Sequence, residues 1–252
     1  MTILLATAAF AQKPQRPPKA NNAPGEAIDM PQAYRELMVG AWQALVVTAA
    51  GWNSVDAHLQ RYEKRDGKWQ RVGEEIPVVL GNNGLGWDAL VEAPPAGAPV
   101  KKEGDGRSPA GIFTIGDAFG FAPTANNLKL SYLPLTDKTE CVDDSSSQSY
   151  NQVVDRDQIA SPDWNSSEKM RTISAYKQGA VVKYNAEDVP DAGSCIFLHI
   201  WSGAGHGTAG CIAMPEDKLT EVLQWLDEKK APVLIQMPAA TYKDVKDKWE
   251  LP

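Results

Sequence analysis

Alternating apolar and polar positions predict that most of this chain forms β-strands. Between Val55 and Lys64 the two kinds of side chain alternate, and an Asp66-Gly67 turn leads into a return strand from Lys68 towards Leu80. Pro77 lies in that return strand, so the strand must bend there or lie at a sheet edge, because proline has no N–H for a ladder. Further apolar runs predict strands at residues 44–48, 111–115, 128–135, 180–184, 195–200 and 233–237.

One segment near the C-terminus carries a clear helical pattern. Apolar residues recur there at the i, i+3, i+4, i+7 spacing of an amphipathic helix: Leu219, Val222, Leu223 and Leu226. Pro215 precedes them, where proline favours a helix start. Shorter helices are expected at residues 31–38 and 242–249. The expected fold class is therefore mainly β, with one well-marked helix and long loops, notably at residues 81–102 and 136–161.

Composition narrows the class of protein further. The chain has 252 residues, of which 43% are hydrophobic and 23% charged, enough for a packed core. Its 32 acidic and 25 basic residues give a net charge of −7, which argues against a nucleic-acid partner. Its apolar runs are shorter than the roughly 20 residues of a membrane-spanning helix. We expect an acidic, monomeric protein with a single core.

The N-terminus has the pattern of an export signal. Residues 1–11 carry no charged side chain and end in Ala9-Phe10-Ala11, a small-x-small pattern typical of a cleavage site. They lack a basic n-region, so a weak signal, an upstream start codon and a short buried element stay open. The segment 12–28 is rich in proline and polar residues and predicts a flexible linker. A folded domain at 29–238 and a tail at 239–252 complete the expected organisation.

Three cysteines are compatible with an oxidising compartment such as the periplasm or cell envelope. They are Cys141, Cys195 and Cys211. Two of them can form a disulfide there, and the sequence alone does not choose among the three possible pairings.

Candidate chemistry is concentrated in the segment Cys195–Met214, which reads CIFLHIWSGAGHGTAGCIAM. An apolar strand there leads to His199, and a glycine-rich loop containing His206 leads to Cys211. Glycines allow such a loop to bring the sulfur to an imidazole, which can accept the thiol proton. Backbone N–H groups around Gly210 and Cys211 are then candidates to hold an oxyanion. Two alternatives stay open: a zinc site on His199, His206 and Cys211, and a structural cysteine.

Two blocks of the sequence resemble a known family. His199 followed by Thr208-Ala209-Gly210-Cys211-Ile212 is similar to a signature of His and then Ser/Thr-x-Gly-Cys-Ile/Val. The block Gly104–Phe113, GDGRSPAGIF, is similar to the family's G-x-T-P-x-G-x-F strand. Over roughly residues 46–237 the chain thus resembles the L,D-transpeptidase catalytic domain, the YkuD or ErfK/YbiS/YcfS/YnhG family. The resemblance implies a β-sandwich catalytic domain within residues 29–238.

The resemblance also implies roles for single residues. Cys211 would attack the carbonyl between the third residue and D-Ala of a peptidoglycan stem tetrapeptide, and His199 would be the general base. The Ile200 carbonyl would orient the imidazole, Thr208 would match the signature hydroxyl, and Gly210 would lie in the oxyanion region. No metal or organic cofactor is implied. The thioester would be resolved by an amine, giving a cross-link, or by water, giving a tripeptide; a non-catalytic wall-binding protein is the third alternative.

The chain departs from the family pattern at two positions. Ala209 stands where many members have histidine, and Ala213 stands where many have arginine. His206 is an additional imidazole that could substitute for one of them, or an exposed loop residue. Trp201 and Arg107 are further candidates to contact the substrate, with core packing and solvated surface charge as their alternatives. The departures indicate a divergent branch of the family.

A nucleophilic Cys211 has a consequence for the other two cysteines. It must be a free thiol, which leaves Cys141 to pair with Cys195. The competing Cys195–Cys211 bridge would silence the enzyme until it was reduced. The family resemblance also implies that peptidoglycan stem peptides are the partners of this protein.

Overall fold

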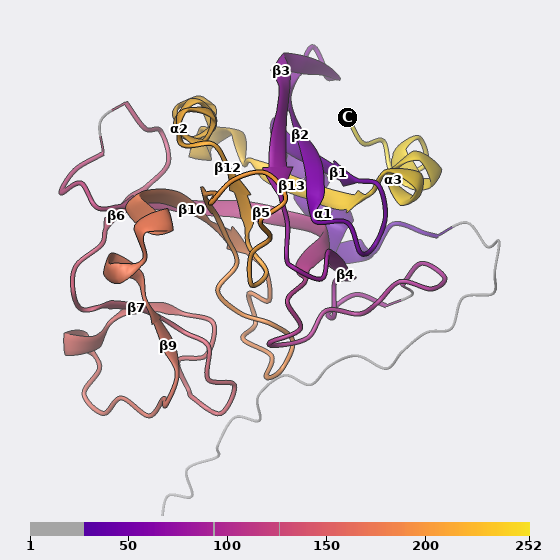
Figure 1. Cartoon of the computed structure of the whole chain (residues 1–252). Helices are drawn as coiled ribbons and strands as arrows, with labels where there is room; N and C mark the ends of the chain where they lie inside the picture. Colours follow the sequence, from indigo (N-terminus) through magenta and orange to yellow (C-terminus); the bar gives the residue numbers. More distant parts are fainter. Residues whose placement is uncertain (1–27, 93, 126) are drawn as a thin grey trace, which may run out of the picture.

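The structure is a computed structural model that describes residues 28–92, 94–125 and 127–252 (Figure 1). The expected signal segment at 1–11 and all but the last residue of the expected linker lie outside the described residues. None of the described helices has both the length and the apolar content needed to cross a bilayer.

A large mixed sheet forms the centre of the molecule (Figure 1). Its strands are β1 (Gln43–Ala49), β2 (Asp56–Arg65), β3 (Lys68–Val79), β4 (Leu85–Trp87), β5 (Ser108–Gly120), β6 (Tyr132–Pro134), β10 (Gln178–Lys183), β11 (Phe197–Ile200), β12 (Ile212–Met214) and β13 (Val233–Pro238). Their hydrogen-bonded order is β10-β11-β12-β3-β2-β1-β13-β5-β4, with β6 paired to β5. A further pairing of β10 with β5 closes the sheet on itself.

The strand β5 makes this closure possible because it is long enough to pair on both sides. Its middle part runs antiparallel to β13, where Ile112 lies opposite Ile235. Its last part runs antiparallel to β10, where Ala118 lies opposite Ala180. These four side chains are buried in the apolar core. The expected mainly β, sandwich-like architecture is confirmed.

Three α-helices accompany the sheet in the described part of the chain: α1 (Gln32–Gly40), α2 (Glu216–Trp225) and α3 (Ala239–Lys246). The helix α2 buries the predicted apolar stripe and contacts β10 and β11. On its other side Glu221 forms an ion pair with Arg61 of β2, which is almost fully buried. Trp249 and Leu251, after α3, return to the core.

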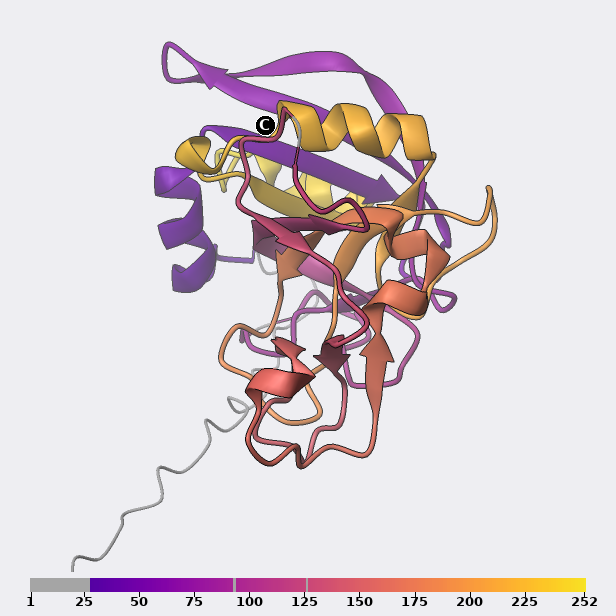
Figure 2. The same cartoon turned by 90° about the vertical axis from the view of Figure 1, so that its left-hand side faces the viewer.

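A second, smaller unit projects from the main sheet, and we call residues 137–177 the lobe (Figures 1 and 2). It contains the strands β7 (Thr139–Val142), β8 (Val153–Asp155) and β9 (Ser167–Lys169), paired in the antiparallel order β8-β7-β9. Short 3-10 turns follow: η1 (Arg156–Gln158), η2 (Met170–Thr172) and η3 (Ser174–Lys177). Another such turn, η4, spans Glu228–Lys230 outside the lobe. The segment expected to be a long loop at 136–161 is therefore partly folded into strands.

The expectation failed there because the strands are short and their buried positions include a charged residue. Glu140 lies in the middle strand of the lobe and is only 2% exposed. Its carboxylate accepts hydrogen bonds from Trp164 Nε1 at 2.8 Å and Ser167 Oγ at 2.7 Å, and pairs with Lys169 and Arg156. A charged residue read from sequence alone predicts an exposed position, whereas here its partners make burial possible.

Candidate active site

The strands β11 and β12 bring His199 and Cys211 to one face of the main sheet. The two strands run parallel, with His199 opposite Ala213. Side chains alternate along a strand, so Cys211, two residues before Ala213, shares a face with Phe197 and His199. The Phe197 N–H donates a hydrogen bond to Cys211 Sγ at 3.3 Å, which fixes the sulfur beside β11. Ala213, the position where many family members carry arginine, is fully buried at this face.

The glycine-rich loop before Cys211 is fastened to the turn that follows β3. Thr208 donates its N–H to the Leu80 carbonyl and accepts from the Asn82 N–H, both at 2.8 Å. A Cβ atom on Gly207 would lie 2.7 Å from Asn82 Oδ1, so only glycine permits this approach without a shift. The loop therefore holds its end at a fixed place next to β12.

Two hydroxyl groups clamp the backbone of the candidate nucleophile. Thr208 Oγ1 donates to the Cys211 carbonyl at 2.7 Å, and Ser108 Oγ donates to the same oxygen at 2.9 Å. The Gly210 N–H donates to Thr208 Oγ1 at 3.1 Å. Because that N–H already has a partner, Gly210 is a less suitable oxyanion donor than the sequence suggests.

Burial controls the charge of both candidate catalytic groups. Cys211 is 5% exposed, and burial, followed by the nearby charge of Glu168, raises the pKa of its thiol far above the usual value. Burial also lowers the pKa of His199, against the opposing effect of the Ile200 carbonyl. At neutral pH the resting site therefore holds a neutral thiol and a neutral imidazole rather than an ion pair.

The His199 imidazole is oriented by the backbone of the next residue. Its Nδ1 lies 2.8 Å from the Ile200 carbonyl oxygen. In the neutral ring Nδ1 then carries the hydrogen and donates it, which leaves Nε2 as the basic nitrogen. The hydrogen bonds of the Cys211 thiol run elsewhere. It accepts from the Phe197 N–H of β11 and donates to the Cys195 carbonyl, just before β11, at 3.4 Å.

Aromatic rings enclose the site on the side of the lobe. The ring of Tyr176, in η3, meets Phe119, Phe197 and His199 edge to face, with centroid distances of 5.8, 5.3 and 5.3 Å. Such edge contacts favour a defined ring position. The Tyr176 hydroxyl donates to Glu168 Oε2 at 2.5 Å, and Tyr176 belongs to the same buried cluster as Cys211.

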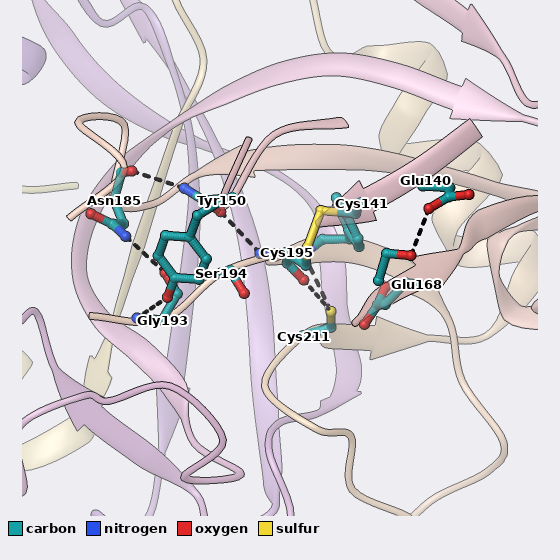
Figure 3. The surroundings of a disulfide bond; sticks show 12 residues. Glu140, Cys141, Tyr150, Glu168, Asn185, Gly193, Ser194, Cys195 and Cys211 are labelled. Atoms are coloured by element: carbon teal, nitrogen blue, oxygen red, sulfur yellow. Dashed lines mark hydrogen bonds between the residues drawn. A yellow bond between two sulfur atoms is a disulfide. The ribbon is translucent and has the colours of Figure 1, made fainter. Parts of the chain in front are cut away.

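A disulfide joins the lobe to the segment just before β11 (Figure 3). It links Cys141 in β7 to Cys195 across 54 residues of sequence and leaves Cys211 as a free, buried thiol. The Cys195 N–H donates to Asn151 Oδ1 at 3.0 Å, while its carbonyl accepts from the Cys211 thiol. Cys195 therefore contacts both the lobe and the candidate nucleophile.

Two cavities lie beside the site. One of about 450 Å³ is bordered by Phe119, Gln178 and Leu223 of α2, and another of about 250 Å³ borders the disulfide and Phe197. Cys211 and His199 line neither cavity, in agreement with their burial. The Cys211 side chain therefore presents little surface to a substrate in this structure.

The other candidate residues lie in different settings. Trp201 is half-buried directly after β11, and His206 is exposed in the loop. The Arg107 guanidinium donates to the carbonyls of Trp52 and Leu85, and to Asn53 Oδ1, so its hydrogen bonds serve the protein's own turns. No group of three or more histidine, cysteine or acidic side chains in the described residues is placed to hold a metal ion, so the zinc alternative gains no support.

Three polar residues at the site were missed by the sequence analysis: Ser108, Glu168 and Tyr176. Ser108 lies within the quoted block 104–113, so that block contained the signal. Glu168 and Tyr176 lie in the lobe, at a distance in sequence from Cys211, and carry no motif of their own.

Comparison with known protein families gives one match. The model of the L,D-transpeptidase catalytic domain, YkuD, matches residues 54–235. Searches of curated proteins and of solved structures find no significant match. The family match spans more than half of the chain and contains both sequence blocks, the aromatic frame and the Cys211–His199 face. The chain belongs to the L,D-transpeptidase catalytic domain family.

Proposed function

We propose that this protein is an exported cysteine acyltransferase that acts on peptidoglycan stem peptides, an L,D-transpeptidase. One observation carries the proposal: the only thiol outside the disulfide, Cys211, shares a face of the sheet with an imidazole whose basic nitrogen is left available by the Ile200 carbonyl. The family match supports the same chemistry.

In the acylation step His199 Nε2 accepts the Cys211 proton, and the sulfur attacks the carbonyl between the third stem residue and D-Ala. The Cys211 N–H is our candidate donor to the resulting oxyanion, because the Gly210 N–H is used by Thr208. Collapse of the tetrahedral intermediate breaks the amide bond, and the proton held by His199 passes to the departing amine of D-Ala. A Cys211 thioester remains.

In the second step an amine of another stem peptide attacks the thioester and forms a cross-link. Water in place of that amine would release a tripeptide, which is the carboxypeptidase alternative. Ser108 and Thr208 act in both steps as positioning residues, since their hydroxyls hold the Cys211 carbonyl and thereby the backbone that carries the sulfur.

The proposal of export is supported by the disulfide. Structural disulfides persist in oxidising compartments and are rare in the cytosol. The Cys141–Cys195 bridge is therefore compatible with a periplasmic or cell-envelope location, where peptidoglycan lies.

The test is mass spectrometry of the purified protein incubated with disaccharide-tetrapeptide under non-reducing conditions. We expect cross-linked dimers with loss of D-Ala from the wild type and none from Cys211→Ala. Tripeptide without dimers would replace the transpeptidase with a carboxypeptidase. Absence of product and of an acyl-enzyme adduct would overturn the proposal.

A matched pair of histidine variants separates the general base from a nearby imidazole. His199→Asn removes the buried ring that shares a face of the sheet with the sulfur, whereas His206→Asn changes an exposed ring of the glycine-rich loop. We expect His199→Asn to reduce turnover by at least about 100-fold, a usual contribution of general-base catalysis, and His206→Asn to retain wild-type turnover. Equal losses in both variants would contradict the role of His199.

A further inference from the structure

A chain of polar contacts links the lobe to the sulfur of Cys211. Glu168 lies in β9, where it pairs with Cys141 of β7, and its Oε2 accepts the Tyr176 hydroxyl at 2.5 Å. Tyr176 and Cys211 pack in the same buried cluster, which places the hydroxyl within reach of the sulfur. Figure 3 shows Glu168 and Cys211 close to the disulfide.

The Tyr176 hydroxyl has one proton for two acceptors. A phenol donates a single hydrogen bond, so it cannot donate to an ionised Glu168 and to a Cys211 thiolate at once. When the Glu168 carboxyl is protonated, its own O–H donates to the Tyr176 oxygen, and the tyrosine proton is free to turn to the sulfur. When the carboxyl is ionised, it holds the tyrosine proton and places a negative charge beside the thiol.

We propose that Glu168 is a positioning residue which the lobe contributes to the active site, and that it acts through the Tyr176 hydroxyl to set the reactivity of Cys211. The proposal extends the proposed function of Cys211 as a nucleophile. It gives the lobe a role in the chemistry: Glu168 of β9 decides whether the thiolate gains a second hydrogen-bond donor besides the Phe197 N–H.

The surroundings of Glu168 place its change of charge in the neutral range. Burial raises its pKa to about 7, against the Tyr176 hydrogen bond, and the charges of Asp143 and Glu103 raise it further. On the Cys211 side, Lys101 is the cation that favours the thiolate. The neutral His199 ring packs on Tyr176 and adds no charge at that pH.

The test is the pH dependence of Cys211 alkylation by iodoacetamide, followed by intact mass under non-reducing conditions, where Cys211 is the free thiol. Glu168→Gln removes the charge but keeps the shape. We expect it to speed alkylation about tenfold at pH 8, because a nearby like charge shifts a pKa by about one unit or more. At pH 5.5, where wild-type Glu168 is largely protonated, the difference should vanish.

Tyr176→Phe should act in the opposite direction. It keeps the ring contacts with Phe197 and His199 but removes the only proton that the hydroxyl could donate to the thiolate. We expect alkylation to slow by about threefold to tenfold at pH 8. A shift of both variants in the same direction, or no shift for Glu168→Gln, would overturn the proposal.

Glu140→Gln is the matched control, because it neutralises another buried carboxylate of the lobe, whose hydrogen bonds come from Trp164 and Ser167. It should loosen the lobe and leave the alkylation profile unchanged; a profile like that of Glu168→Gln would show that lobe loosening is the cause and would contradict the proposal. Circular dichroism and an intact disulfide confirm folding of each variant. Alkylation is independent of substrate, so these profiles can support the inference even if the stem-peptide assay fails. A positive stem-peptide assay can likewise support the proposed function even if the alkylation profiles contradict the inference.

Discussion

The main sheet and the lobe are stabilised by different interactions. Leu45, Leu234 and Ile235, on adjacent strands of the main sheet, are fully buried among other apolar side chains. The buried positions of the lobe include Glu140 and Ser147, which are held by hydrogen bonds and ion pairs. The apolar unit carries the candidate nucleophile and base, and the lobe places the charge of Glu168 near the sulfur.

Carboxylates that accept several hydrogen bonds help to shape the loops of the lobe. Asp144 accepts hydrogen bonds from the Ser146 hydroxyl and from the Asn165 N–H, which hold its pKa at about 2. Asp163 accepts from Ser147 Oγ at 2.5 Å and from the Gln148 N–H at 3.0 Å. Such contacts depend on ionisation, so the lobe should respond to pH and to loss of its covalent link more strongly than the main sheet.

The largest expected effect comes from removing the disulfide. Cys141→Ser with Cys195→Ser opens a loop of 54 residues, which should lower the free energy of unfolding by about 4 kcal/mol in the chain-entropy estimate. Urea denaturation measures the change, with Cys211→Ser as the control that removes a thiol and leaves the bridge. Unchanged stability of the double variant would show that the lobe is held by its polar contacts alone.

Matched truncations should separate the two units next. Leu45→Ala in β1 leaves a cavity in the core and should cost about 3 kcal/mol. Val153→Ala in β8 removes a half-buried side chain and should cost less than about 1 kcal/mol. Thermal and urea unfolding of both variants provide the comparison. Similar losses would contradict the view that the lobe depends little on apolar packing.

Acid should weaken the lobe before the main sheet, with the smallest effect of the three. Burial raises the pKa of Glu140, but hydrogen bonds from Lys169, Ser167 and Trp164 outweigh it and hold the pKa at about 2. A carboxyl with a depressed folded-state pKa stabilises the fold above its unfolded value of about 4.3, and this contribution is lost as pH falls towards 2.

The fluorescence of Trp164, which packs under Arg156 in the lobe, can follow that loss. Between about pH 4.5 and 2 we expect a transition in the wild type, worth up to about 2 kcal/mol, that is flattened in Glu140→Gln. A Glu140→Gln protein with the wild-type acid transition would assign the pH dependence to other carboxylates, such as Asp144.

The two units also differ in how far they could be predicted from the sequence. The β2–β3 hairpin and α2 follow from apolar periodicity, because each element buries one face against the core. Cys211 and His199 follow from their spacing and the glycines between them. Periodicity cannot reveal β7 or β9, which are three or four residues long.

The direction of a single side chain was also beyond the sequence. Arg107 lies in a family-like block and was a candidate to contact the substrate, with solvated surface charge as the alternative; its guanidinium instead donates to the protein's own carbonyls. Tyr176 and Glu168 come to the sulfur only through the path of the lobe, which depends on long-range pairing. These two residues could therefore be identified as neighbours of the nucleophile only from the structure.

The burial of Cys211 has a consequence for its chemical lifetime. Peroxides attack thiolates rather than thiols, and a sulfur that is both protonated and covered presents little of the reactive form. In the resting protein Cys211 should therefore resist conversion to sulfenic and sulfinic acid, although it sits beside a disulfide in a setting suited to oxidation. The features that make it a slow nucleophile at rest would thus preserve it between turnovers.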